Sequence, residues 1–158
     1  MLALAALCGC HTDKKKAEDC SLRVCLESGA PSAKTIYVLR SAPVAVPIES
    51  EPILSEANIV EARVIDAPGG FAIQLQFDES STLVLEQYSA ANPGKHLVIV
   101  AKWGNSPLDG RPLAAPLITH RISNGVLSFT PDMTRSEADR LVAGLGTISK
   151  ETRKGDFK

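Results

Sequence analysis

The most informative run of apolar and polar positions begins with residues 115–129. Leu117–Ser123 and Val126–Phe129 are typical of short strands, and Asn124-Gly125 stands between them. This dipeptide is favoured in the tight turn of a β-hairpin, because the turn requires a positive φ at both of its central residues. The pattern predicts that the two segments pair with each other.

A helix is predicted directly after that hairpin. Thr134 and Glu137 have the spacing of a capping box, in which each side chain accepts a hydrogen bond from a backbone N–H at the helix start. The residues that follow place apolar side chains on one helical face: Ala138, Leu141, Val142 and Leu145. This segment therefore contributes one helix to the core.

The N-terminal part is predicted to be β-structure. Residues 21–27 alternate as a half-buried strand should, and residues 34–40 form a second apolar strand after a turn. Together they predict an N-terminal hairpin. Residues 41–52 carry three prolines, which cannot donate to a central ladder, so that stretch is expected at a sheet edge or as an extended connector.

The middle of the chain adds strands and another helix. A strand with Val60, Ala62 and Val64 on one side is joined by a turn at residues 68–70 to an alternating strand at residues 71–77. Asp78 or Ser80 can cap the next helix. The inner stripe of that helix is expected to be Val84, Leu85 and Tyr88, and residues 92–94 stop it.

Residues 96–103 form a nearly continuous apolar run, typical of a central strand covered on both faces, and a long loop follows at residues 104–114. A sheet with helices on one face buries these stripes most economically. The expected fold class is α+β, a two-layer sandwich with a mainly antiparallel sheet and two helices on one face.

Composition restricts the function classes. Of 158 residues, 44% are apolar and 22% charged, enough for a real core, and a formal net charge of −1 lacks the basic footprint of a nucleic-acid-binding protein. His11, His96 and His120 are scattered without a second ligand at metal spacing, and no hydrolase or nucleotide-binding motif is present. We expect no metal, no cofactor and no enzymatic activity.

The N-terminus resembles a bacterial lipobox. Leu7-Cys8-Gly9-Cys10 places a small residue before a cysteine, after a short apolar stretch. The match implies lipid attachment at Cys10 and an anchor on the periplasmic side of the cell envelope, with the outer membrane favoured by His11. The stretch is shorter than a usual signal peptide, which a start further upstream would explain. The alternative is an unstructured N-terminus with two chance cysteines.

Two further cysteines are expected to remain unpaired. On one strand, Cys20 and Cys25 would lie about 16 Å apart at ~3.3 Å per residue, whereas a disulfide needs Cα atoms within about 7 Å. Cys25 is interpreted as a small apolar packing residue.

Several segments together resemble the first periplasmic domain of SecD, the membrane subunit of protein export. These are residues 51–64, the helix ending in YSAANPGKHLVIV, then AAPLI and the TRSEADRLVAGL helix. The resemblance implies a ferredoxin-like α+β domain and a mobile extracytoplasmic role in engaging unfolded chains. It implies no catalytic residue. The chain lacks the membrane helices of SecD, so we do not expect its proton-driven cycle here.

The expected organisation is a truncated signal peptide at 1–9, a tether at 10–20, a hairpin and connector at 21–50, a SecD-like domain at 51–148 and a charged tail at 149–158. Trp103, Asp109 and Arg111 mark a candidate protein-contact loop, because exposed Trp and Arg are frequent at binding hot spots. Alternatively, Trp103 covers the core at a strand end.

We therefore expect a lipid-anchored, non-enzymatic protein that binds an unidentified protein or peptide partner and no nucleic acid. An envelope-assembly protein unrelated to export and an enzyme with an unrecognised site are the alternatives.

Overall fold

The computed structural model describes residues 20–155, with side chains through residue 149. The predicted lipid-attachment residue Cys10 lies outside this range, as do residues 1–9 and most of the predicted tether. Within the described range the elements are, in order, β1 (Cys20–Leu26), β2 (Lys34–Val38), β3 (Val44–Ile48), β4 (Leu54–Ser55), η1 (Glu56–Asn58), β5 (Ile59–Ala67), β6 (Gly70–Phe77), α1 (Glu79–Ala91), β7 (Leu97–Trp103), β8 (Gly110–Ala114), β9 (Val126–Phe129) and α2 (Arg135–Gly155).

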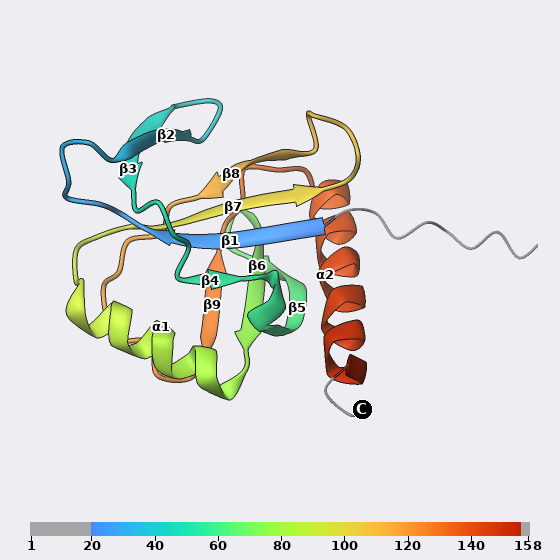
Figure 1. The fold of residues 1–158 in the computed structure, drawn as a ribbon. Helices are drawn as coiled ribbons and strands as arrows, with labels where there is room; N and C mark the ends of the chain where they lie inside the picture. Colours follow the sequence, from blue (N-terminus) through green and yellow to red (C-terminus); the bar gives the residue numbers. More distant parts are fainter. Residues whose placement is uncertain (1–19, 156–158) are drawn as a thin grey trace, which may run out of the picture.

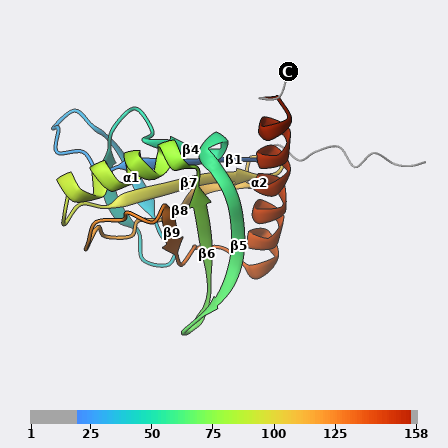
Figure 2. The same cartoon turned by 90° about the horizontal axis from the view of Figure 1, so that it is seen from below.

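The predicted α+β class and the antiparallel pairing are confirmed (Figure 1). The strands, however, are divided among three sheets rather than one. A four-stranded sheet has the order β4-β1-β7-β8, a three-stranded sheet the order β5-β6-β9, and β2 and β3 pair only with each other. Figure 2 shows α1 running along the four-stranded sheet, with α2 standing at its end.

The predicted N-terminal hairpin is wrong. Strand β1 pairs with β7 over its whole length, from Cys20 opposite Trp103 to Leu26 opposite Leu97. Strand β2 pairs with β3 instead, so the proline-containing residues 44–48 are a strand at a sheet edge. Alternation along β1 shows correctly that one face is buried, but it carries no information about which apolar strand lies beside it.

The predicted hairpin around Asn124-Gly125 is also wrong. Strand β9 pairs with β6, and residues 117–123 form no strand, only a single bridge between Leu117 and His96. Gly125 has a positive φ of 67°, whereas Asn124 does not, so the turn is not of the expected type. The Asn124 side chain instead accepts a hydrogen bond from the backbone N–H of Val126 at 3.1 Å, as in an Asx turn.

Both predicted helix starts are confirmed. The backbone N–H of Thr134 donates to Glu137 at 2.7 Å, and the backbone N–H of Glu137 donates to the Thr134 hydroxyl at 3.3 Å. Asp78 caps α1 by accepting from the backbone N–H of Ser81 at 2.7 Å. Within the predicted apolar face of α2, three residues are buried and one is partly buried against the same core.

The inner face of α1 differs from the prediction at one residue. Leu85 is fully buried and Val84 is partly buried, but Tyr88 is 36% exposed. The buried neighbours of Leu85 are instead the small residues Ser81 and Ser89. The Ser89 hydroxyl accepts a hydrogen bond from the backbone N–H of Ile122 at 2.8 Å, which lets α1 approach residues 115–125 closely.

Helix α2 is longer than expected. It continues through residue 155, so most of the predicted tail at 149–158 is helical backbone. In the part of the chain that the structure describes, no helix is both long and apolar enough to cross a membrane.

The main core lies on the inner face of the four-stranded sheet. There β1 and β7 pack their inward side chains against the three-stranded sheet and both helices. A second, smaller core lies on the outer face, where Val38 and Val46 of the β2–β3 hairpin pack on Val98 of β7. We refer to residues 34–48, which include this hairpin, as the arm.

Candidate protein-binding groove

The arm covers only one end of the outer sheet face. Successive side chains of a strand point to opposite faces, so Val98, Val100 and Lys102 of β7 all face outward. Val98 is fully buried beneath the arm, whereas Val100 is only partly buried. Beyond Val98 the arm and the sheet diverge, and a groove opens between them.

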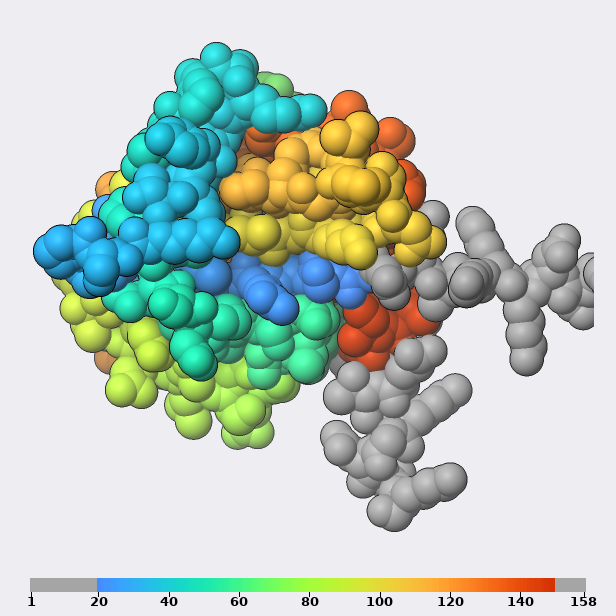
Figure 3. All heavy atoms as spheres, turned by 45° about the horizontal axis from the view of Figure 1, so that its top comes forward, coloured from blue at the N-terminus to red at the C-terminus, as the bar shows by residue number. Residues whose placement is uncertain are grey.

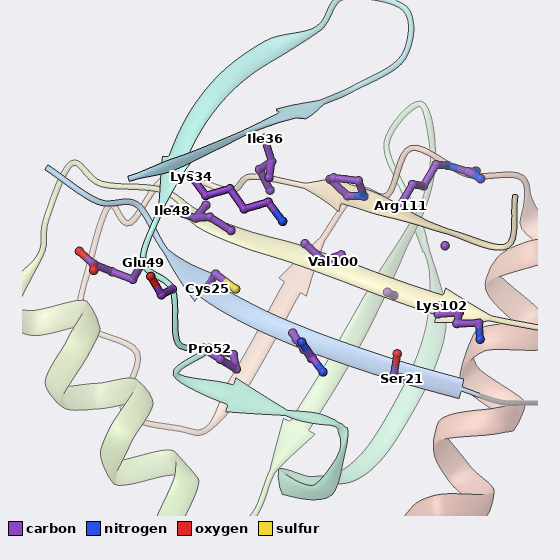
Figure 4. A pocket seen from close by; sticks show the side chains of 15 residues that line it. Ser21, Cys25, Lys34, Ile36, Ile48, Glu49, Pro52, Val100, Lys102 and Arg111 are labelled. Atoms are coloured by element: carbon purple, nitrogen blue, oxygen red, sulfur yellow. The ribbon is translucent and has the colours of Figure 1, made fainter. Parts of the chain in front are cut away.

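The groove has a volume of about 610 Å³ and is bounded by the arm, β1, β7, β8 and the segment before β4. Figure 3 shows the arm standing beside the surface of these strands. Figure 4 shows Lys34 and Ile36 of β2 facing the strands that carry Cys25 and Val100. The lining residues are Ser21, Arg23, Cys25, Lys34, Ile36, Ile48, Glu49, Ser50, Pro52, Val100, Ala101, Lys102, Gly110, Arg111 and Pro112.

The lining combines an apolar floor with cationic side chains. Ile36, Ile48 and Val100 extend the small core beneath the arm directly into the groove. Burial raises the pKa of the Cys25 thiol, although nearby Arg23 acts to lower it. Cys25 is thus a neutral packing residue of the floor, as its sequence context predicted.

The predicted contact residues lie together at the end of β7 that borders this groove. Trp103 is only 1% exposed, and the guanidinium of Arg111 stacks over its ring at 4.7 Å from the centroid. The backbone N–H of Trp103 donates to the Asp109 carbonyl at 2.8 Å. Trp103 thus covers the core at a strand end, which is the alternative interpretation of the sequence. The large hydrophobic side chain that this loop exposes is Leu108, at 82%.

The predicted loop at 104–114 is partly a strand. Gly110–Ala114 forms β8, which pairs with β7. The register of this pairing shifts between Ile99 and Val100, as in a β-bulge. The bulge was not visible in the sequence because it depends on the pairing partner.

Arg111 connects β8 to the start of α2. Its guanidinium donates to the Glu137 carboxylate at 3.1 Å and to the Asp132 carbonyl at 3.0 Å, and its side chain is only 15% exposed. Partial burial acts to raise the pKa of Glu137, but hydrogen bonds from Thr134 and Arg111 outweigh this effect and lower it. Arg111 is therefore held in place at the end of the groove.

The arm is attached to the body by an ion pair at its far end. The backbone N–H of Arg40 donates to the Asp132 carboxylate at 2.7 Å, and the guanidinium of Arg40 donates to it at 3.2 Å. The hydrogen bond from Arg40 lowers the pKa of Asp132. Leu39, immediately before, has a φ of 68°, a conformation rare for a residue with a side chain.

The structure also contains a histidine–carboxylate pair that no sequence pattern predicted. His96 Nδ1 lies 2.7 Å from Glu27 Oε2, and the backbone N–H of His96 donates to the same oxygen at 2.8 Å. Partial burial acts to raise the pKa of Glu27, but its hydrogen bonds with His96 lower it overall. Among the described side chains of residues 20–149, no three His, Cys, Asp or Glu residues are grouped to hold a metal ion.

Sequence reasoning missed the groove residues Arg23 and Lys34. Both occupy polar positions of alternating strands, where charged side chains are ordinary. Their proximity depends on the arm folding over β1 and β7, which no local pattern reveals. The run of prolines in residues 43–52 was a partial signal, because it marked the arm as an edge element.

Comparisons with known proteins agree with this fold. The chain is similar to a solved structure of SecDF, a membrane component that enhances protein export, with 18% identity over 83% of this chain and 64% of that one and a TM-score of 0.59. It is also similar to SecDF in a super-membrane-facing form, with 20% identity over 83% of this chain and 19% of that one and a TM-score of 0.61.

These identities show the shared fold alone, and the chain spans less than two thirds of each matched structure. No curated protein sequence matches the chain. The family described as SecDF, P1 head subdomain, matches residues 33–147, which make up most of this chain. The chain therefore belongs to the SecDF P1 head subdomain family.

Proposed function

We propose that this protein is a non-enzymatic, extracytoplasmic module that binds segments of other polypeptide chains in the groove between the arm and the four-stranded sheet. The observation that carries the proposal is the groove itself, whose apolar floor continues the small core beneath the arm. A concave, mostly apolar site with a few polar groups is the usual form of a binding site. Membership of the SecDF P1 head subdomain family supports a link to protein export.

The proposal places the protein on the periplasmic side of the cell envelope, held by a lipid on Cys10. The outer membrane is the favoured location, as the residue after that cysteine suggests. The loop at 104–109 adjoins the groove, and its exposed Leu108 extends the contact surface beyond the groove. Trp103 and Arg111 position this loop from beneath.

Photo-crosslinking tests the binding site. A photoreactive residue replaces either Ile36, in the groove, or Leu83, which is 63% exposed on α1. Each variant is irradiated in two separate mixtures. One contains a secreted polypeptide that is kept unfolded by reduction and neutral alkylation, and the other contains the same polypeptide in its folded form. We expect crosslinks from position 36 to the unfolded form alone. Equal crosslinking from both positions, or none from position 36, contradicts the proposal.

The lipid anchor has a separate test. Expressed in a bacterium, the protein is expected in the membrane fraction with an acylated N-terminal cysteine detected by mass spectrometry. Cys10→Ser is expected to release it into the soluble fraction, and Cys8→Ser, two residues earlier, serves as the matched control. An unmodified N-terminus in the wild-type protein contradicts lipid attachment.

A further inference from the structure

The groove concentrates positive charge on a protein that is slightly acidic overall. Four of its lining residues are cationic (Arg23, Lys34, Lys102 and Arg111) and one is acidic (Glu49), whereas the whole chain has a formal net charge of −1. Such a local excess of one sign attracts ligands of the opposite sign and raises their association rate.

Two of the four cations are available to a ligand. Arg23 and Lys34 are exposed, and among the side chains that the structure describes, those of residues 20–149, neither of them forms an ion pair. Arg111 differs, because its guanidinium is already bound to Glu137. Arg23 belongs to β1, on the sheet side of the groove, and Lys34 belongs to β2, on the arm side, where Figure 4 shows it facing the sheet. A chain lying in the groove therefore passes between the two strands that carry these residues.

The dimensions fit a short extended segment. The groove follows β1 from Ser21 to Cys25, a span of about 13 Å at ~3.3 Å per residue. That length accommodates about five residues of an extended chain, whose side chains point alternately to opposite sides. Aliphatic side chains of such a segment would contact Ile36 on the arm and Val100 on the sheet.

We propose that the groove selects extended polypeptide segments that combine aliphatic with acidic side chains. This inference rests on the proposed protein-binding function. The aliphatic side chains pack on the floor, and the carboxylates pair with Arg23 and Lys34. The floor supplies affinity for unfolded chains in general, whereas the two cations discriminate by charge. Segments rich in lysine or arginine are disfavoured, because they place like charges beside these two residues.

The test compares two capped, fluorescent five-residue peptides, one alternating valine with glutamate and the other valine with lysine. Fluorescence anisotropy at low salt is expected to show that the glutamate peptide binds about ten-fold more tightly than the lysine peptide. A difference of this size is expected when two partly exposed attractive charge pairs are replaced by two repulsive ones. Raising the salt concentration is expected to reduce the difference, because exposed charges are screened.

The double variant Arg23→Glu, Lys34→Glu is expected to abolish or reverse the preference. The matched control is the double variant Arg63→Glu, Arg121→Glu, which reverses two exposed charges on other surfaces. This control is expected to keep the preference for the glutamate peptide. Circular dichroism confirms that both variants fold. A preference that survives in the groove variant, or disappears equally in the control, overturns the inference.

Failure of this inference can be distinguished from failure of the proposed function. If both peptides bind the wild-type protein equally, and the unfolded polypeptide still crosslinks to position 36, the charge preference is wrong and the binding function stands. If neither peptide binds and position 36 captures nothing, both fail. Binding of anionic lipid vesicles that requires Arg23 and Lys34, with no discrimination between the peptides, assigns these cations to a membrane surface and overturns the inference.

Discussion

At the scale of single residues, Arg111 makes the densest set of polar contacts described around the groove. It stacks on the buried Trp103 ring, pairs with Glu137 and donates to a backbone carbonyl of residue 132. A guanidinium can make these contacts together, because it is planar and carries several donors in fixed directions. The sequence singled out Trp103 and Arg111 as residues of a candidate contact loop, and their burial shows that they support this loop from beneath.

We predict that Arg111→Lys lowers the free energy of unfolding by about 1–2 kcal/mol, because lysine keeps the charge but loses the stacking and the two-pronged contact. Arg63→Lys is the control, since Arg63 forms an exposed pair with Glu61 and its replacement is expected to cost less than about 0.5 kcal/mol. Urea unfolding measures both variants. Equal losses would contradict the structural role given to Arg111.

The Arg40–Asp132 pair predicts a dependence of stability on pH. Because the pKa of Asp132 is lowered in the folded protein, its pairing stabilises the fold at pH values above the ordinary aspartate value of 3.8. This contribution is lost as the pH falls through the lowered pKa. The stability difference between wild type and Asp132→Asn is therefore expected to be constant from about pH 5 to 8 and to shrink below about pH 4. A difference that persists unchanged at pH 2 would contradict the assignment.

At the scale of elements, local signals predicted the helices better than the strand pairs. Caps and apolar stripes act within one turn of a helix, so Asp78, Thr134 and Glu137 could be identified from spacing alone. Strand partners depend on residues far away in the chain, and for that reason both predicted hairpins were wrong although most of their strands exist. The groove depends on those pairings, and so the sequence could not predict it.

We predict that two leucine-to-alanine changes on α1 separate its buried and exposed faces. Leu85→Ala is expected to cost about 2–5 kcal/mol, because the side chain is fully buried and its removal leaves a cavity. Leu83→Ala, at a position 63% exposed, is expected to change stability by less than about 0.5 kcal/mol. Thermal or urea unfolding measures both. Similar losses at the two positions would contradict the orientation of α1.

At the scale of the whole molecule, β1 unites the parts of the fold. It is an interior strand of the four-stranded sheet, its inner residues belong to the main core and its outer residues line the groove. It also precedes residue 33, where the family match begins. The folded unit in this chain therefore includes residues before that match.

We predict that a chain starting at residue 33 does not unfold cooperatively, because it exposes the edge of β7 and lacks three core side chains that are at most 5% exposed, Leu22, Val24 and Leu26. A chain starting at residue 20 is expected to unfold in one cooperative transition. Differential scanning calorimetry compares the two. A sharp transition of equal enthalpy in the shorter chain would contradict the place given to β1.

The central claim is that the outer face of the four-stranded sheet, beneath and beside the arm, binds extended segments of other polypeptides. An NMR titration of the isotope-labelled protein with an unfolded secreted polypeptide tests it most directly. We predict amide shift changes concentrated at groove residues such as Cys25, Ile36 and Val100, with α1 unaffected. Shift changes confined to α1 or to the edge of β9, or none at saturating polypeptide, would contradict it.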